Sequence, residues 1–210
     1  RYPGAVVFDC MIIWSGSPEM GPIAVPGTYQ VKVTANGVTQ TQPIVVRLDP
    51  RLKGVTVQDV TEQFSLASQT RDRVSTANEA VIRIRRLKSQ IANRLSKDTD
   101  AKLAASGAAL SAKLSAIEED LYQVRNRSGQ DPLNFPIKLN NRLAALERSI
   151  ESGDGKPTAG SYVVLKELSA ELDAHLAKLN ALTGTEVPAF NARLTARKLE
   201  PLREPPATVP

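Results

Sequence analysis

The sequence has very few residues of the types that build metal, redox and ring-lined ligand sites. Cys10 is the only cysteine, which excludes an internal disulfide, and His175 is the only histidine. One residue of each kind is too few for the Cys and His sets that bind zinc. Aromatic residues make up 4% of the chain and apolar residues 41%, a balance that favours helix packing over a ring-lined pocket. We therefore expect no metal site, no cofactor and no small-molecule substrate.

Long apolar runs are also missing. No stretch of eighteen apolar residues occurs, so the sequence predicts no transmembrane segment of its own. The chain begins Arg-Tyr-Pro-Gly, without methionine and without the charged-then-apolar layout of a signal peptide. We interpret the chain as a processed product or a piece of a longer polypeptide.

No catalytic arrangement follows from the remaining polar residues. His175 lies two positions after Asp173, so the two side chains leave a helix on different faces. No Gly-x-Ser-x-Gly motif is present, and we interpret His175 as a half-buried packing residue. The acidic residues 118–120 lie between apolar positions of a predicted helix and are expected to point outward, whereas sugar hydrolysis needs carboxyl groups that face each other across a cleft. The sequence predicts that the protein is not an enzyme.

A long helix is the clearest feature of the sequence. Apolar residues recur every three or four positions over residues 57–95, and no glycine or proline interrupts them. Thr56 is the expected N-cap, with Asp59 facing the positive end of the helix. Further apolar stripes predict helices over about residues 100–124, 136–152 and 158–198. Gly107 leaves room for a neighbouring helix to approach closely. We expect an antiparallel bundle of about four α-helices, of which the first is overlong.

The first fifty residues predict strands and turns instead of helices. Four strands are expected, over residues 5–8, 11–14, 28–34 and 38–48. Asn36-Gly37 is typical of a type I′ hairpin turn, because both positions tolerate a positive φ. Pro43 indicates an edge or a bulge in the return strand.

The sequence therefore predicts an α+β protein of three parts. These are a small antiparallel β-domain over residues 1–50, the helical bundle over residues 51–198 and a proline-rich extended tail over residues 199–210. The tail is expected to be free or to lie on a partner.

Positive charge is concentrated on the predicted long helix. Residues 51–97 contain ten Lys and Arg and four Asp and Glu, an excess of six, while the whole chain carries +5. The densest cluster consists of Arg83, Arg85, Arg86 and Lys88. Two interpretations stay open, a solvated outer helix face and an electrostatic patch for an acidic partner. We do not favour nucleic acid as that partner, because no aromatic residues are interleaved with the cations.

Several segments together resemble a known family. Residues 21–33, 36–37, 41–43 and 45–51 are similar to the end of an immunoglobulin-like module of the type in flagellar hook-cap proteins. The same module closes many secreted bacterial proteins built on a sortilin-like β-propeller, often called glycosyl hydrolases with BNR repeats. Residues 134–146 and 187–191 resemble the helical tail of those proteins.

The resemblance implies an Ig-like fold for residues 1–50 and a periplasmic or extracellular location in a bacterium. The 210 residues contain no propeller repeat of the Ser-x-Asp-x-Gly kind, so the propeller's activity does not carry over. An Ig-like sandwich needs about seven strands, whereas residues 1–50 supply four or five. We therefore expect an open sheet edge near Val45 and Arg47 at which a partner can pair.

These features favour a non-enzymatic interaction or scaffold subunit that docks on a larger assembly, on the periplasmic face of a membrane complex. Two alternatives stay open, the non-catalytic C-terminal part of a secreted β-propeller hydrolase-like protein and a binder of nucleic acid or anionic lipid through the basic helix. The candidate partner-binding residues are Arg83, Arg85, Arg86, Lys88, Val45 and Arg47.

Overall fold

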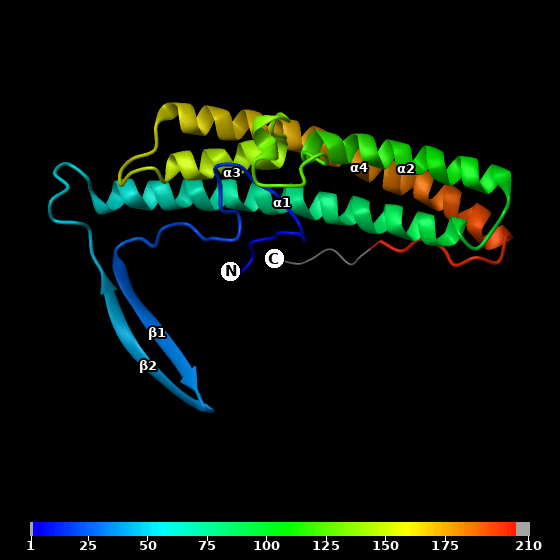
Figure 1. Cartoon of the computed structure of the whole chain (residues 1–210). Coiled ribbons are helices and arrows are strands. Elements are labelled where there is room, and N and C mark those ends of the chain that lie inside the picture. The colour runs from blue at the N-terminus through cyan, green and yellow to red at the C-terminus, as the bar shows by residue number, and fades with distance from the viewer. Residues whose placement is uncertain (1, 205–210) are drawn as a thin grey trace.

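The computed structural model describes residues 2–204, which fold as a two-stranded antiparallel sheet followed by four helices (Figure 1). The elements are β1 (Gly27–Ala35), β2 (Val38–Val46), α1 (Val57–Leu95), α2 (Ala101–Leu121), the short 3-10 helix η1 (Asp131–Leu133), α3 (Leu139–Ile150) and α4 (Ala159–Ala196). This is the mixed α+β class that the sequence predicts.

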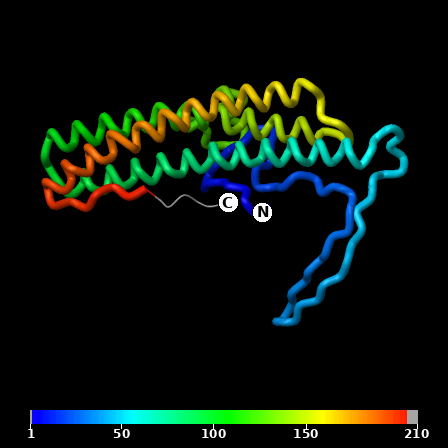
Figure 2. Tube along the Cα trace, turned by 180° about the vertical axis from the view of Figure 1, so that it is seen from behind, coloured from blue at the N-terminus to red at the C-terminus, as the bar shows by residue number. Residues whose placement is uncertain are grey.

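The four helices form three rows that run up, down and up. α1 spans the bundle, α2 and α3 return along it one after the other, and α4 runs back beside them (Figures 1 and 2). α1 accordingly packs against each of the other three helices. α1 has 39 residues and α4 has 38, so the expectation that the first helix alone is overlong is not confirmed. α1 and α4 each extend along both α2 and α3, which follow one another in the middle row. α4 reaches this length because it continues through Pro188.

The start of α1 follows from its capping residues. The Thr56 hydroxyl accepts a hydrogen bond from Asp59 N at 3.2 Å, and the Asp59 carboxylate accepts one from Thr56 N at 2.9 Å. These two bonds form the reciprocal capping box that satisfies free amides at a helix N-terminus. The predicted limits of this helix are therefore confirmed.

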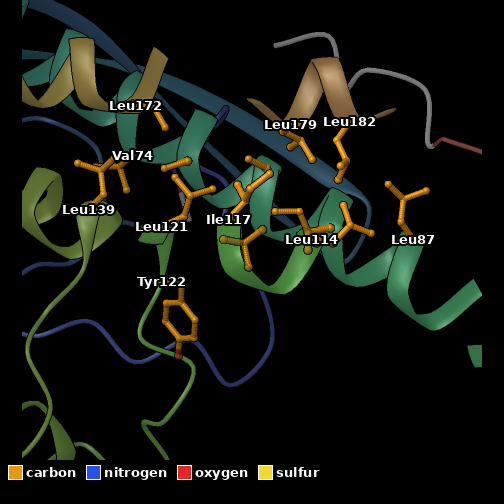
Figure 3. Packing of buried hydrophobic residues seen from close by; sticks show 14 of the residues in the cluster. Val74, Leu87, Leu114, Ile117, Leu121, Tyr122, Leu139, Leu172, Leu179 and Leu182 are labelled. Atoms are coloured by element: carbon orange, nitrogen blue, oxygen red, sulfur yellow. The ribbon is translucent and has the colours of Figure 1, made fainter. Parts of the chain in front are cut away.

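The apolar core lies where the three rows meet. Leu87 of α1, Leu114 of α2, Leu139 of α3 and Leu172 of α4 are each at most 1% exposed. Figure 3 shows these side chains together with other apolar residues of the same helices. Burying one leucine side chain contributes roughly 1.5–3 kcal/mol, so this line of contacts is the main source of stability of the bundle.

Gly107 of α2 allows close approach to α1 and α4, as the sequence predicts. A Cβ atom at this position would lie 2.8 Å from Leu95 Cδ1 and 3.2 Å from both Ile91 Cγ2 and Phe190 Cζ. These distances are shorter than or close to the limit of van der Waals contact, so the site is filled without a side chain.

Replacing Gly107 with leucine should therefore lower the free energy of unfolding by about 1–3 kcal/mol, because the new side chain overpacks the junction of three helices. Chemical denaturation monitored by circular dichroism measures the change. Ala108→Leu is the matched control, since Ala108 is exposed on the same helix and its replacement should shift stability by less than about 0.5 kcal/mol. Equal effects of the two variants would contradict the close packing at Gly107.

The N-terminal arm, residues 2–25, is not part of a sheet. The strands expected over residues 5–8 and 11–14 do not form, and that prediction is wrong. Trp14 N donates to Asn141 Oδ1 at 2.7 Å, and Asn141 Nδ2 donates back to Trp14 O at 2.6 Å. Asn78 Nδ2 in turn donates to Val6 O at 2.8 Å. Helix side chains thus satisfy backbone groups that strand partners would otherwise satisfy.

The described part of the C-terminal tail lies on helices of its own chain. Leu202 is 4% exposed, and its backbone N and O both bond to the Asn191 side chain of α4. Arg94 of α1 binds Glu200 at 2.9 Å. The tail was expected to be free or to lie on a partner, and residues 199–204 do neither. The remainder of that prediction, residues 205–210, lies outside the described residues.

Candidate protein-docking surface

The β1–β2 hairpin leaves the bundle at the end where α1 begins and diverges from the helices (Figures 1 and 2). Its turn has φ values of 50° at Asn36 and 78° at Gly37, which are the left-handed conformations that a type I′ turn requires. The predicted hairpin is therefore confirmed, although β2 ends at Val46 instead of residue 48.

The register of the hairpin gathers most of its apolar side chains on one face. Tyr29, Val31 and Val33 alternate along β1, and their directly paired residues, Ile44, Gln42 and Gln40, lie on the same face as they do. We call the apolar residues of this face the docking face, and they are Tyr29, Val31, Val33, Ala35, Val38 and Ile44. Val33 is 60% exposed and Val38 64%, so no described residue covers these side chains.

An uncovered apolar face on an isolated ribbon is energetically unusual. A two-stranded hairpin is marginally stable in water and normally needs further strands or a packed surface. Every residue of β1 and β2 is exposed except Val46, which is half-buried. Contiguous exposed apolar patches on soluble proteins mark interaction sites. The docking face is therefore the strongest candidate site among residues 2–204.

Val45 and Arg47, which the sequence proposes as partner-binding residues, lie next to the docking face but not on it. Val45 pairs with Thr28 on the opposite, polar face and is 55% exposed. Arg47 follows β2 and is exposed. Sequence reasoning did not single out the docking face itself, although the alternation over residues 28–34 was the available signal.

The basic cluster on α1 is largely engaged within the chain. Arg83 binds Glu204 at 2.6 Å and also donates to Asn180 and Thr183 of α4. Arg86 is exposed. The ion pair of Arg83 leaves less free positive charge for an acidic partner than the sequence alone indicates.

Arg85 and Lys88 share the buried carboxylate of Glu118. Arg85 Nε lies 2.6 Å and Lys88 Nζ 2.9 Å from the two Glu118 oxygens. The Arg85 guanidinium also stacks 4.6 Å from the ring centroid of Phe8 in the N-terminal arm. Glu118 is 3% exposed, so the expectation that residues 118–120 all point outward is wrong for this residue. These two cations of α1 pair with the Glu118 carboxylate, and the ion pairs offset the free-energy cost of burying it.

The structure does not bring the two predicted groups of partner-binding residues together. Residues 47–56 connect the hairpin to the first turn of α1, whereas Arg83 lies 26 positions after the first residue of the helix. At 1.5 Å per residue this separation is about 39 Å. The hairpin and the basic cluster are therefore two separate surfaces.

A pocket of about 450 Å³ lies between the N-terminal arm and α3, and Glu147 and Glu151 line it. Burial is the main cause that raises the pKa of Glu147 to about 7, and the neighbouring Glu151 carboxylate adds to it. Arg71 acts in the opposite direction and lowers this pKa. Burial also raises the pKa of Glu151, although one of its oxygens accepts a hydrogen bond from Ile23 N at 2.6 Å. The pKa values of two carboxyl groups that line this pocket, four positions apart in sequence, are therefore both raised.

His175 Nδ1 lies 3.6 Å from Asp120 Oδ2 of α2, and the imidazole is largely buried. Within residues 2–204, no group of three or more His, Cys, Asp or Glu side chains is placed to hold a metal ion. In the same range, no helix is both long enough and apolar enough to cross a membrane.

Comparisons of the chain with protein-family models, with curated proteins and with solved structures found no match. The resemblance to the C-terminal region of sortilin-like propeller proteins therefore stays a prediction.

Proposed function

We propose that this protein is a non-enzymatic scaffold subunit that docks on a larger protein assembly through the β1–β2 hairpin. The observation that carries the proposal is the docking face, whose apolar side chains are exposed on a ribbon that diverges from the bundle. Burial of such a face is favourable at about 25 cal/mol per Å², and contact with a partner protein would provide it. The helical bundle acts as the rigid arm that holds the hairpin.

In this proposal the hairpin is the last strand pair of an Ig-like sandwich whose other strands belong to the partner. The sequence of residues 21–51 supports this, because it resembles the end of such a module. The same resemblance supports a bacterial, periplasmic setting on the outer face of a membrane complex. Arg86 and Arg47 are exposed and provide additional contacts with acidic groups.

A second candidate shares the same observation. The hairpin also fits the non-catalytic C-terminal part of a secreted β-propeller hydrolase-like protein, in which the missing strands belong to the same polypeptide. The intact mass of the native polypeptide separates the two functions. A chain near 22.7 kDa in a large complex supports the docking subunit, and a much heavier single polypeptide supports the second candidate.

The test of docking uses adjacent residues on opposite faces of β1. Val33→Lys places a charge on the docking face, whereas Thr34→Lys places the same charge on the polar face. We expect Val33→Lys to reduce the fraction of tagged full-length chain in the high-mass membrane assembly at least tenfold, because a buried unpaired cation is costly. Native electrophoresis of source membranes measures this fraction. Equal retention of the two variants would contradict docking through this face.

A further inference from the structure

The two edges of the hairpin differ in what they offer to another strand. A two-residue turn closes on a hydrogen-bonded pair, here Ala35 and Val38, and hydrogen-bonded and non-hydrogen-bonded pairs then alternate along the ribbon. Gln30 and Pro43 therefore form a non-hydrogen-bonded pair, whose backbone groups point away from the partner strand. This position suits Pro43, because proline has no N–H to give to the ladder.

The outer edge of β1 is consequently complete, and that of β2 is interrupted. Thr28, Gln30, Lys32 and Thr34 direct both N–H and C=O outward from β1, and no hydrogen bond from residues 2–204 reaches these backbone groups. The corresponding row on β2 lacks a donor at Pro43. An incoming strand can therefore form a full ladder only with β1.

Charge identifies the kind of strand that fits. Between residues 27 and 47 the only charged side chains are Lys32, in the middle of β1, and Arg47. Both are cations, so the same hairpin of a second copy would bring only further cations to the edge. An acidic residue opposite Lys32 would instead form a favourable cross-strand pair. Charge complementarity thus favours a different polypeptide over a second copy.

We propose that the outer edge of β1 accepts an extended strand of another protein. The strand carries apolar residues on the side of the docking face and an acidic residue opposite Lys32. This inference rests on the proposed docking function and adds its geometry. Backbone hydrogen bonds along β1 give the affinity, and the alternate side chains of the added strand give specificity as they extend the docking face.

The probe is a synthetic nine-residue peptide of alternating threonine and valine, with glutamate at the central polar position. Hydrogen exchange on the full-length chain should show at least tenfold slower exchange of the amides of Thr28, Gln30, Lys32 and Thr34 when the peptide is present. The outward amides of β2, at Thr39, Thr41 and Val45, should exchange at an unchanged rate. A peptide with lysine in place of glutamate should bind at least fivefold more weakly.

Proline variants test the edge without changing the docking face. Gln30→Pro removes one outward N–H from β1, and Thr41→Pro removes one from β2, and neither amide belongs to the β1–β2 ladder. We expect Gln30→Pro to weaken peptide binding at least tenfold and Thr41→Pro to leave it within twofold. The docking face and the hairpin turn are the same in both variants.

The outcomes separate this inference from the proposed function. If Val33→Lys abolishes membrane assembly while the two proline variants bind the peptide equally, docking stands and strand addition at β1 is wrong. Protection of β2 amides, or no protection by the peptide at all, also overturns the inference. A dimer of the chain joined through β1, detected by analytical ultracentrifugation and lost in Gln30→Pro, would make a second copy the occupant and overturn it as well.

Discussion

Glu118→Ala is expected to lower the free energy of unfolding by about 2–4 kcal/mol. Glu118 is almost fully buried on α2, and its carboxylate binds both Arg85 and Lys88. Its removal leaves two cations of α1 without their counterion beside an apolar core. Both cations are about a third exposed and can turn partly toward solvent, so the loss is below the upper limit for a buried pair.

The control for this prediction is the next residue of the same helix. Glu119 is exposed, and Glu119→Ala should change stability by less than about 0.5 kcal/mol. Urea denaturation at neutral pH compares the two variants with the parent chain. If Glu118→Ala unfolds at the same urea concentration as Glu119→Ala, the shared ion pair contributes nothing and the basic cluster is free for other partners.

The same ion pairs bear on the alternative of a nucleic-acid or anionic-lipid binder. A phosphate group could use Arg85 or Lys88 only in competition with Glu118, which is held beside them at 2.6 and 2.9 Å. Arg83 meets the same competition from Glu204. Binding through this cluster would fall steeply with salt and would be lost on replacing Arg83, Arg85 and Arg86 with alanine. Docking through the hairpin does not require a partner to displace Glu118 or Glu204 from these cations.

Local sequence patterns predict those parts of the fold that depend on local interactions. The limits of α1 follow from apolar spacing and from the capping pair of Thr56 and Asp59, which are neighbours in sequence. The hairpin follows in the same way from Asn36 and Gly37, whose backbone preference decides the turn. In each case the residues that determine the structure lie within a few positions of one another.

The failures involve partners that are distant in sequence. Residues 11–14 have a β pattern, yet Trp14 pairs with the side chain of Asn141, which is 127 positions away. An extended segment that pairs with helix side chains has the same local pattern as a strand. Glu118 was expected to face solvent because it lies between apolar positions of its own helix. The spacing within one helix does not predict that cations of α1 pack against it.

Glu147 gives the second large effect, because it is a carboxyl group held where ionisation is unfavourable. It faces Glu151 and Arg148 on its own helix and Arg71 and Asp72 on α1. Its pKa is raised to about 7 from an ordinary value of 4.5, chiefly by burial. The unfolded chain therefore loses this proton at a lower pH than the folded chain does.

The free energy of unfolding should consequently fall as the pH rises from about 4.5 to 7, and should level off above that range. Glu147→Gln keeps the shape of the side chain without its charge, so it should match the parent at pH 4.5 and exceed its stability by roughly 2 kcal/mol at pH 8. Urea denaturation across this range gives the difference between the two proteins. Glu167→Gln, on an exposed position of α4, is the control for the removal of one carboxyl group. A difference for Glu147→Gln that does not change with pH would mean that the carboxylate is solvated in the folded chain and that the N-terminal arm does not close over it.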